Sequence, residues 1–374
     1  MGGGDAPYDG AMTTPLRRTR SSRIAAAVVL GVLAASCSGD NDTTATADEA
    51  ATTTDAASPD RPTTTAVDSV ADAGAAVPSA GCGTGGHPAL TAEKVTMEVA
   101  DEERYYLLTV PEGTDEAPAP VVFDFHGLME GAELAAKASR LPELGVEEGF
   151  ITVVPNGRGN PVSWDVTPDP ATNPDMAFVA EVLDTLEAEQ CVDTSRVYAT
   201  GLSNGAMMTS GVACAFPDRV AAVAPVAGVM ASCEDTDRPV PMLGFHGTAD
   251  PILFFNGGVG DLGGLIAGTA DASKVPEADL EGAGYPAAVA EWAVRNGCED
   301  SFTDEQVEDD VTRRTYECPE GADVIFDIVV GGGHTWPGSE FNAQLGDLMG
   351  PTTLNLDASA TMWAFFSRFQ LPTG

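Results

Sequence analysis

The sequence has few basic residues and few histidines. Of its 374 residues, 18 are Lys or Arg, against 57 Asp or Glu, so the formal net charge is −39. Charge of this sign repels the nucleic-acid backbone and anionic lipid headgroups, which argues against a protein that binds either one. With only 4 histidines in the chain, the search for a catalytic imidazole is short.

A long apolar run is also missing. Residues 24–35 (IAAAVVLGVLAA) are too few to span a membrane, and four arginines precede them. We therefore predict that residues 1–37 are a signal peptide and that the mature protein is extracellular or at the cell surface. The sequence Ala-Ala-Ser-Cys that ends at Cys37 resembles a bacterial lipoprotein cleavage box, in which this cysteine becomes lipidated. An ordinary cleavage site is the alternative.

Large apolar side chains are nearly absent from residues 38–80. Thr, Ala, Asp and Ser dominate this segment, and three prolines interrupt it. Burial cannot offset the entropy that such a segment would lose on ordering, so we predict a disordered linker. No second seam of this kind occurs in residues 81–374, which we interpret as a single catalytic domain.

Metal-binding spacings of cysteine are missing too. No two of the seven cysteines stand at C-x-x-C spacing and no histidine lies close to a pair, so we expect no metal site. In an exported protein, the six cysteines after Cys37 indicate disulfides, and six allow fifteen pairings. They are Cys82, Cys191, Cys214, Cys233, Cys298 and Cys318. The sequence favours Cys298 with Cys318, because the residues between them resemble a short connection from the end of a helix (WAVRNGC) to a strand (TRRTYEC). The other pairings stay open.

Strand-like and helix-like runs alternate through residues 81–374. Several strand-like runs are continuously apolar, which is typical of central parallel strands covered on both faces. The predicted strands are residues 105–111, 120–127, 150–156, 195–201, 220–228, 240–247 and 322–334, and the predicted helices include 175–189, 204–215, 286–296 and 358–369. This alternation predicts a doubly wound, mostly parallel α/β sheet, with its site at the carboxyl ends of the strands.

One junction between a predicted strand and a predicted helix carries the pattern Gly-x-Ser-x-Gly at residues 201–205, with Ser203 at its centre. This is the context of a nucleophile elbow, in which small residues permit a strained turn that exposes the hydroxyl group in front of a helix N-terminus. Ser203 is therefore the candidate nucleophile.

A nucleophilic serine needs a base, normally a histidine that a carboxylate orients. In α/β-hydrolases the chain order is Ser, then Asp or Glu, then His. Two histidines follow Ser203, and the first of them, His246, precedes the best acid, Asp250 in HGTADP. His334 in GGGHTWPG is therefore the predicted base. Asp250 is the predicted orienting acid, and we interpret His246 as a structural brace for its loop.

A His-Gly pair ends an earlier predicted strand, at His126 and Gly127. It matches the turn that supplies an oxyanion donor in this fold. The predicted donors are the backbone N–H groups of Leu128 and of Asn204, the residue after the nucleophile.

Over residues 81–374 the chain resembles the polyhydroxybutyrate depolymerase and feruloyl esterase family of secreted α/β-hydrolases. The resemblance rests on six segments in this order: HGL, VVPNGRGNPVSWDV, CVDTSRVYATGLSNGAMM, VAPVAG, PVPMLGFHGTADPILFFNGG and GGGHTWPG. It implies the α/β-hydrolase fold and the same roles for the serine, aspartate and histidine. It also implies that Trp164 and Trp336 flank an acyl pocket, with core packing as the alternative. Residues 254–284 are longer than the family's usual connection and are interpreted as a lid or a tolerated insertion.

These patterns predict a secreted serine esterase that acts through an acyl-enzyme and needs no metal or organic cofactor. The main predicted substrates are hydroxyalkanoate oligomers, as for a polyhydroxybutyrate depolymerase. Feruloyl or acetyl xylan esters on plant polysaccharide are the alternative. A serine peptidase of the same fold and a non-catalytic, ligand-binding lipoprotein also stay open. The only membrane contact that we expect is the N-terminal lipid anchor.

Overall fold

The computed structural model describes residues 74–86, 88–114, 117–230, 238–267 and 274–372. All of them belong to one unit of the chain, Val67–Gly374. The expected signal peptide, the lipidation candidate Cys37 and the linker up to residue 73 lie outside the described residues, as do His87 and Cys233. Among the helices that are described, none is long and apolar enough to cross a bilayer.

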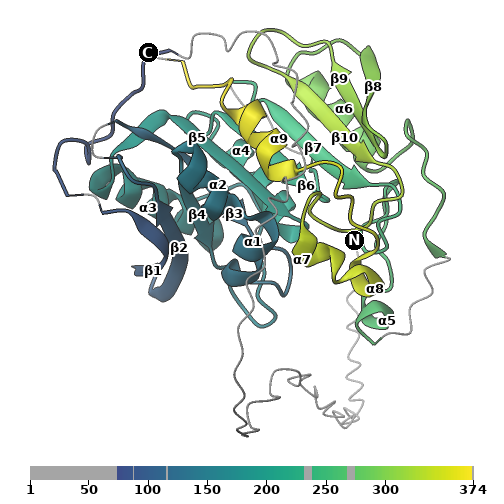
Figure 1. The fold of residues 1–374 in the computed structure, drawn as a ribbon, viewed down its shortest axis with the longest axis horizontal. Coiled ribbons are helices and arrows are strands. Elements are labelled where there is room, and N and C mark those ends of the chain that lie inside the picture. The colour runs from purple at the N-terminus through teal and green to yellow at the C-terminus, as the bar shows by residue number, and fades with distance from the viewer. Residues whose placement is uncertain (1–73, 87, 115–116, 231–237, 268–273, 373–374) are drawn as a thin grey trace, which may run out of the picture. The chain divides into compact units, whose positions relative to one another are not determined.

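A mixed sheet forms the middle of this unit (Figure 1). Its strands are β1 (Leu90–Val99), β2 (Glu102–Val110), β3 (Ala119–Phe125), β4 (Ile151–Pro155), β5 (Val192–Leu202), β6 (Ala222–Val226), β7 (Met242–Gly247), β8 (Phe302–Glu308), β9 (Val311–Tyr316) and β10 (Val324–Val329). They lie in the order β1-β2-β4-β3-β5-β6-β7-β10-β9-β8. In the order of the sheet, the strands β4, β3, β5, β6, β7 and β10 are parallel to one another. The edge strands β1 and β2 on one side, and β9 and β8 on the other, add antiparallel pairs.

Helices cover both faces of the sheet, which explains why a central strand such as β3 is buried at every position. The helices are α1 (Ala132–Ser139), α2 (Leu141–Glu148), α3 (Pro174–Glu189), α4 (Asn204–Ala215), α5 (Leu262–Ile266), α6 (Tyr285–Arg295), α7 (Glu340–Ala343), α8 (Gly346–Met349) and α9 (Ala358–Phe366). The side chains of α3, α4 and α6 share one apolar core with the sheet, and those of α2 and α9 share a second. In the second core, the rings of Tyr198 on β5 and Phe366 on α9 stack at 4.8 Å.

The doubly wound, mostly parallel sheet of an α/β-hydrolase was predicted from the sequence and is confirmed. The bounds of α4 agree with the predicted helix at residues 204–215. The strand predicted at residues 322–334 ends earlier, at Val329, because the glycines that follow form the loop of His334. Strands β1 and β8 were missed, since most of their side chains are exposed and their sequences contain no apolar run.

The fold begins before residue 81, where the expected linker was to end. The Val77 N–H donates to Asp193 Oδ1 at 3.0 Å, and Pro78 pairs with Asp193 as an antiparallel bridge. The Ser79 N–H donates to the carbonyl of Val192 at 2.9 Å. The last residues of the predicted linker therefore pack along the start of β5, because their backbone groups find partners there. The linker boundary at residue 80 is corrected accordingly.

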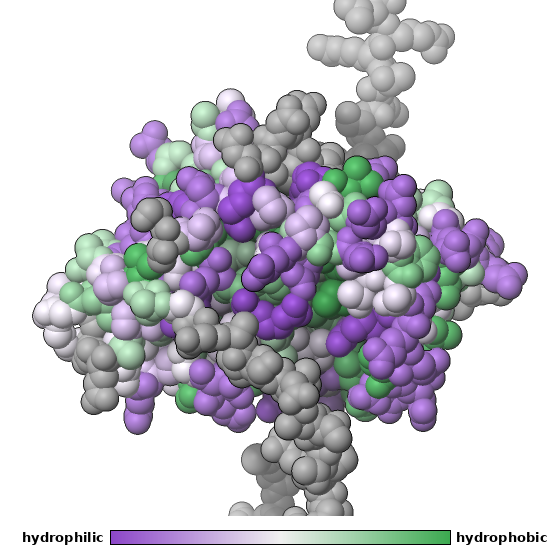
Figure 2. Space-filling view, turned by 90° about the horizontal axis from the view of Figure 1, so that it is seen from above, coloured by the Kyte–Doolittle hydropathy of each residue, from purple (hydrophilic) through white to green (hydrophobic). Residues whose placement is uncertain are grey.

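The view of Figure 2 shows hydrophilic side chains over most of the face that it presents, with apolar side chains in small separate groups. Burial of the apolar side chains in the two cores leaves mainly hydrophilic groups for this surface.

Two disulfides close loops of very different length. Cys82 is bonded to Cys191 across 109 residues, and Cys298 is bonded to Cys318, the pair that the sequence favoured, across 20 residues. Cys214 is also disulfide-bonded. The second pair joins the end of α6 to the end of β9 and therefore fixes the antiparallel edge strands to the helix layer.

We predict that replacing both Cys298 and Cys318 by alanine lowers the free energy of unfolding by about 3 kcal/mol. The open chain gains the entropy that a closed loop of this size removes from the unfolded state. Urea unfolding of the variant and the wild type under oxidising conditions measures the difference, with the Cys82–Cys191 bond intact in both proteins. Equal free energies of unfolding would contradict the prediction.

Candidate active site

Ser203 lies at the turn between β5 and α4. Its φ is 60° and its ψ is −120°, a backbone conformation that costs a non-glycine residue free energy and is found mainly at functional sites. The turn is held because the Ser203 N–H donates to the carbonyl of Val226 at 2.9 Å and the Ser203 carbonyl accepts the N–H of Met207 at 3.0 Å. Within the described part of the chain, its Oγ has no hydrogen-bond partner, and the residue is partly exposed.

The two glycines of the Gly-x-Ser-x-Gly pattern are required by the end of the neighbouring strand β3. A Cβ atom at Gly205 would lie 1.9 Å from the carbonyl oxygen of Phe125, and one at Gly201 would lie 2.5 Å from the same oxygen. Both distances are far shorter than any real contact of a Cβ atom. The absence of side chains here lets the turn at Ser203 press against the strand that leads to His126.

Asp250 and His334 are joined by a hydrogen bond of 2.7 Å from Nδ1 of the histidine to Oδ2 of the aspartate. Asp250 follows β7, and its Oδ1 accepts the N–H groups of Ile252 and Leu253, each at 2.8 Å. His334 lies on the loop after β10, where its own N–H donates to the carbonyl of Met349 at 2.6 Å. Both side chains are buried. The structure therefore brings together the predicted acid and base, which are 84 residues apart in the chain.

His246 lies on the other side of the same carboxylate. Its Nε2 is 2.9 Å from the carbonyl of Leu253 and 3.2 Å from Asp250 Oδ2, and its ring stacks on Tyr285 at 3.9 Å. Because a carbonyl only accepts, Nε2 carries a proton and donates. The histidine thus braces the loop of Asp250, as the sequence suggested.

The carboxyl group of Asp250 stays ionised over the whole physiological pH range. Burial alone would raise its pKa, but the charge of His334 and the hydrogen bonds from His246 and His334 hold the pKa well below its ordinary value. An ionised acid in this position keeps a proton on Nδ1 of His334 and leaves Nε2 free to accept one.

His126 directly follows β3 and is a neutral side chain. Its Nε2 accepts the N–H of Gly157 at 2.8 Å, so the proton lies on Nδ1, which donates to the carbonyl of Gly127 at 2.7 Å. Burial lowers the pKa of His126 to about 4, and the bond to Gly127 offsets part of this shift. A protonated ring could not accept from Gly157, so neutrality is a condition of this geometry.

The carbonyl of Gly127 sets the direction of the Leu128 N–H. This carbonyl accepts from His126 Nδ1 and, at 3.2 Å, from the N–H of Glu130. A trans peptide unit is planar, so its C=O and N–H point in opposite directions. Holding the carbonyl therefore holds the Leu128 N–H on the other side. Among the described residues, neither this N–H nor that of Asn204 has an acceptor.

Glu130 is a carboxyl group of the site that sequence reasoning missed. Its Oε2 accepts the Gly127 N–H at 2.6 Å, and a Cβ atom built on Gly127 would lie 3.2 Å from this oxygen and 3.5 Å from the Cβ of Ser203. Burial raises the pKa of Glu130, while the Gly127 N–H and the nearby His334 oppose part of this shift. The sequence holds one indication of this contact: Glu130 follows the His-Gly pair by three residues, close enough for a turn to bring its carboxylate back to Gly127.

Trp164 is buried, with 5% of its surface exposed. Its indole N–H donates to the carbonyl of His126 at 2.9 Å, and its ring meets Phe125 edge to face at 5.4 Å. The amide side chain of Asn204 holds its backbone on both sides, through Oδ1 at 2.7 Å and Nδ2 at 3.2 Å. These contacts favour the alternative that Trp164 is a packing residue that supports the loop of His126.

Trp336 is 2% exposed and belongs to the apolar core beneath α9. Its indole N–H donates to Ser359 Oγ at 3.1 Å, and its backbone N–H donates to Asn342 Oδ1 at 2.7 Å. Here too the contacts favour packing over contact with an acyl group.

The described parts of the segment at residues 254–284 are closed at their base by one side chain. Asn256 Nδ2 donates to the carbonyls of Asp279 and Ala283 at 2.7 and 2.9 Å, and its Oδ1 accepts the N–H of Asp279 at 2.7 Å. The helix α5 lies within this segment. Asn256 lies three residues after Leu253, whose carbonyl contacts His246, so the segment begins beside the loop of Asp250.

We predict that His126 makes stability depend on pH. The unfolded imidazole binds a proton near pH 6.5 and the folded one only near pH 4, so the unfolded state holds more protons between these values. The contribution of the neutral His126 to the free energy of unfolding is therefore fully present above pH 6.5, and about 3 kcal/mol of it is lost as the pH drops to 4. Urea unfolding of the wild type and of His126→Gln at pH 7 and pH 4.5 measures this contribution: between these pH values the wild type should lose about 3 kcal/mol relative to the variant, which lacks the titrating ring.

Asp124 supplies the internal control for this measurement. Burial raises its pKa to about 7, so it contributes a change of the opposite sign in both proteins and cancels in the comparison. An identical pH dependence of wild type and His126→Gln would show that the prediction is wrong.

The chain is similar in sequence to several known proteins. The family model described as the prolyl oligopeptidase family matches residues 138–242. The putative esterase NocK of Nocardia uniformis subsp. tsuyamanensis is 31% identical over 261 residues, which cover 65% of this chain and 73% of that protein. Feruloyl esterase B of Piromyces equi is 26% identical over 280 residues, or 72% of this chain.

The match to Feruloyl esterase B covers 46% of that protein, so the chain spans about half its length. The bifunctional acetylxylan esterase/xylanase XynS20E of Neocallimastix patriciarum is 29% identical over 136 residues, which are 36% of this chain and 20% of that protein.

The sheet order and the surrounding helices define an α/β-hydrolase fold. Through its similarity to NocK, the chain belongs to the α/β-hydrolase esterase family.

Proposed function

We propose that the protein is a serine esterase that removes feruloyl or acetyl groups from plant polysaccharide, with Ser203 as nucleophile, His334 as base and Asp250 as orienting acid. One observation carries this proposal: the buried hydrogen bond of 2.7 Å between His334 Nδ1 and Asp250 Oδ2. It is made at the edge of the sheet where Ser203 occupies its strained turn.

The first half of the reaction forms an acyl-enzyme. Ser203 Oγ attacks the ester carbonyl carbon while His334 Nε2 takes the hydroxyl proton, and the ionised Asp250 stabilises the imidazolium. The developing oxyanion accepts from the N–H groups of Leu128 and Asn204. The imidazolium then protonates the departing alcohol, so the carbon–oxygen bond of the ester breaks as the acyl bond to serine remains.

The second half regenerates the enzyme. His334 Nε2 takes a proton from water, the resulting hydroxide equivalent attacks the acyl carbon, and the same two N–H groups hold the oxyanion. Collapse of this intermediate returns the proton to Ser203 and releases the carboxylic acid. These steps use only groups of the chain and water.

The names of the relatives favour one of the substrate alternatives. Their names point to feruloyl and acetylxylan esters, whereas the main expectation from the sequence, polyhydroxybutyrate, finds no support in them. Apolar side chains beside the site agree with an acyl group such as a feruloyl group. Leu128 and Met129, on the loop after the His-Gly pair, are 42% and 54% exposed, and Leu348, next to the residue that contacts His334, is 36% exposed.

The place of action is proposed to be outside the cell. Disulfides persist in oxidising compartments, and the described residues contain the pairs Cys82–Cys191 and Cys298–Cys318. The signal peptide at residues 1–37 and the lipid anchor at Cys37 remain proposals from the sequence.

A serine peptidase is the second candidate, because the prolyl oligopeptidase family model matches the part of the chain that contains Ser203. The esterase proposal expects hydrolysis of p-nitrophenyl butyrate and none of an aminoacyl p-nitroanilide. Hydrolysis of the anilide alone would replace the proposal with the peptidase.

We predict that Ser203→Ala lowers kcat on p-nitrophenyl acetate by five to six orders of magnitude, roughly the loss typical of a missing nucleophile. A fluorophosphonate probe should label the wild type and leave this variant unlabelled. Ser210→Ala, on the same helix, should keep kcat within a few fold. A wild type that the probe does not label, together with equal turnover in the wild type and Ser203→Ala, would support the non-catalytic lipoprotein instead.

The substrate is tested with a panel of esters at equal concentration. We expect higher kcat/KM on methyl ferulate or acetylated xylo-oligosaccharides than on oligomers of 3-hydroxybutyrate, because the relatives act on the former classes by name. Release of acid is followed by titration at constant pH. A preference for hydroxybutyrate oligomers would restore the expectation from the sequence.

A further inference from the structure

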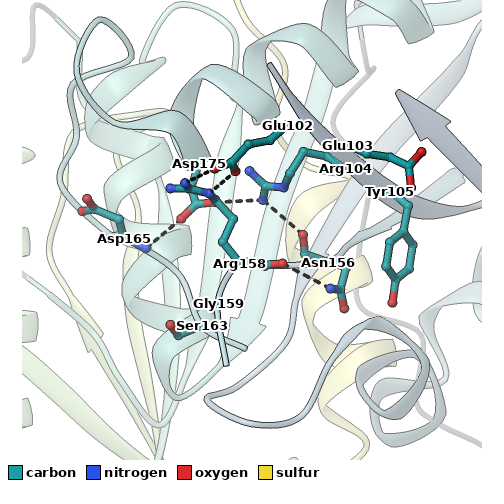
Figure 3. A pocket seen from close by; sticks show the side chains of 11 residues that line it. Glu102, Glu103, Arg104, Tyr105, Asn156, Arg158, Gly159, Ser163, Asp165 and Asp175 are labelled. Atoms are coloured by element: carbon teal, nitrogen blue, oxygen red, sulfur yellow. Dashed lines mark hydrogen bonds and ion pairs between the residues drawn. The ribbon is translucent and has the colours of Figure 1, made fainter. Parts of the chain in front are cut away.

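A polar cavity lies apart from Ser203, Asp250 and His334. Its volume is about 740 Å³, and the start of β2, the loop after β4 and the start of α3 line it (Figure 3). We call it the polar pocket. It is lined by polar side chains that include Glu102, Arg104, Arg158, Asp165 and Asp175. None of these side chains has a part in the proposed mechanism.

The polar pocket lies at the same edge of the sheet as Ser203. Strand β2 runs antiparallel to β4, so the first residues of β2 lie beside the carboxyl end of β4. In the sheet, β4 is two strands from β5, which ends before Ser203. Neighbouring strands are about 5 Å apart, so roughly 10–15 Å separate the pocket from the serine.

One loop forms a wall of both sites. The Gly157 N–H donates to His126 Nε2 at 2.8 Å, and the Trp164 N–H donates to Asn204 Oδ1 at 2.7 Å. Between these two anchors, Arg158 and Ser163 line the pocket. A substrate that extends along this loop would reach from the serine into the pocket.

The charged side chains of the pocket are held in fixed planes. Arg158 donates from Nε and Nη2 to the two oxygens of Glu102, each at 2.6 Å, and Arg104 Nη2 donates to Asp175 Oδ1 at 2.8 Å (Figure 3). The side chain of Arg104 is 4% exposed, and among the described residues its Nε has no partner. Carboxylates and guanidinium groups held in this way keep acceptors and donors for a ligand.

The charge of the pocket selects the class of ligand. The lining residues carry four carboxylates, on Glu102, Glu103, Asp165 and Asp175, against two guanidinium groups, so an anionic ligand is repelled. Within the described residues no group of side chains is suited to a metal ion. A neutral polyhydroxyl ligand uses both kinds of group, since each hydroxyl donates to a carboxylate and accepts from a guanidinium.

We propose that the polar pocket is a subsite for neutral sugar residues of the polysaccharide that carries the ester. This inference rests on the proposed function, because it places the ester carbonyl at Ser203 and neighbouring sugars of the same chain along the loop of Arg158. The pocket recognises the alcohol part of the substrate and makes no contact with the acyl group.

The first test measures binding without an ester. Xylohexaose is titrated into Ser203→Ala, and the heat of binding is recorded. We expect saturable binding that weakens about tenfold when Arg158→Ala or Glu102→Gln is added, because each change removes a charge-assisted hydrogen bond. Arg368→Ala, which removes an equally exposed ion pair with Asp323 elsewhere on the molecule, is the matched control and should bind as Ser203→Ala does.

The second test uses the selectivity of the active enzyme. The ratio of kcat/KM on acetylated xylohexaose to that on p-nitrophenyl acetate should fall about tenfold in Arg158→Ala and Glu102→Gln, mainly through KM, and stay constant in Arg368→Ala. An unchanged ratio in both pocket variants, no binding of xylohexaose, or tighter binding of oligogalacturonate would overturn the subsite. Absence of turnover on every ester would instead refute the proposed function.

Discussion

The close contact between the end of β3 and the turn at Ser203 is the constraint on which the site depends. Glycines at positions 201 and 205 let the carbonyl of Phe125 approach the turn to a distance that no side chain would permit. His126 and Gly127 directly follow β3, so the same contact brings the His-Gly loop beside the serine. The strained backbone of Ser203 is thereby held by packing from the neighbouring strand, and a Cβ atom at Gly127 would lie 3.5 Å from the Cβ of Ser203.

Two buried ionisable groups of the site differ in charge because their hydrogen-bond partners differ. His126 stays neutral because its surroundings penalise a cation, and only a neutral ring can accept from Gly157. Asp250 stays anionic at the same depth, because four donors surround its two oxygens. Desolvation acts on both groups, and the hydrogen-bond partners decide the outcome. The loop proposed to stabilise the oxyanion therefore carries a neutral His126, whereas Asp250, proposed to stabilise the imidazolium, carries a negative charge.

Much of the fold could be read from the sequence, because parallel strands covered on both faces need continuous apolar runs. The central strands and α3, α4, α6 and α9 were found for this reason. The edge strands β1 and β8 were missed, since a half-exposed strand has no such run. Ser203, Asp250 and His334 could be named from the order of the chain. Glu130 could not, because its role depends on a turn that brings its carboxylate back to Gly127, and the packing of Trp164 depends on the amide of Asn204 40 residues away.

The chain enters the fold at the edge of the sheet opposite the one that carries Ser203. Residues 77–79 pair with the first residues of β5, whereas Ser203 follows its last residue. An extended strand of 11 residues separates these two points by roughly 35 Å. Any tether that precedes Val77 therefore joins the amino-terminal edge of the sheet, opposite the edge that carries the serine. If Cys37 is lipidated, as proposed, the anchor is attached through the edge of the sheet that does not carry Ser203.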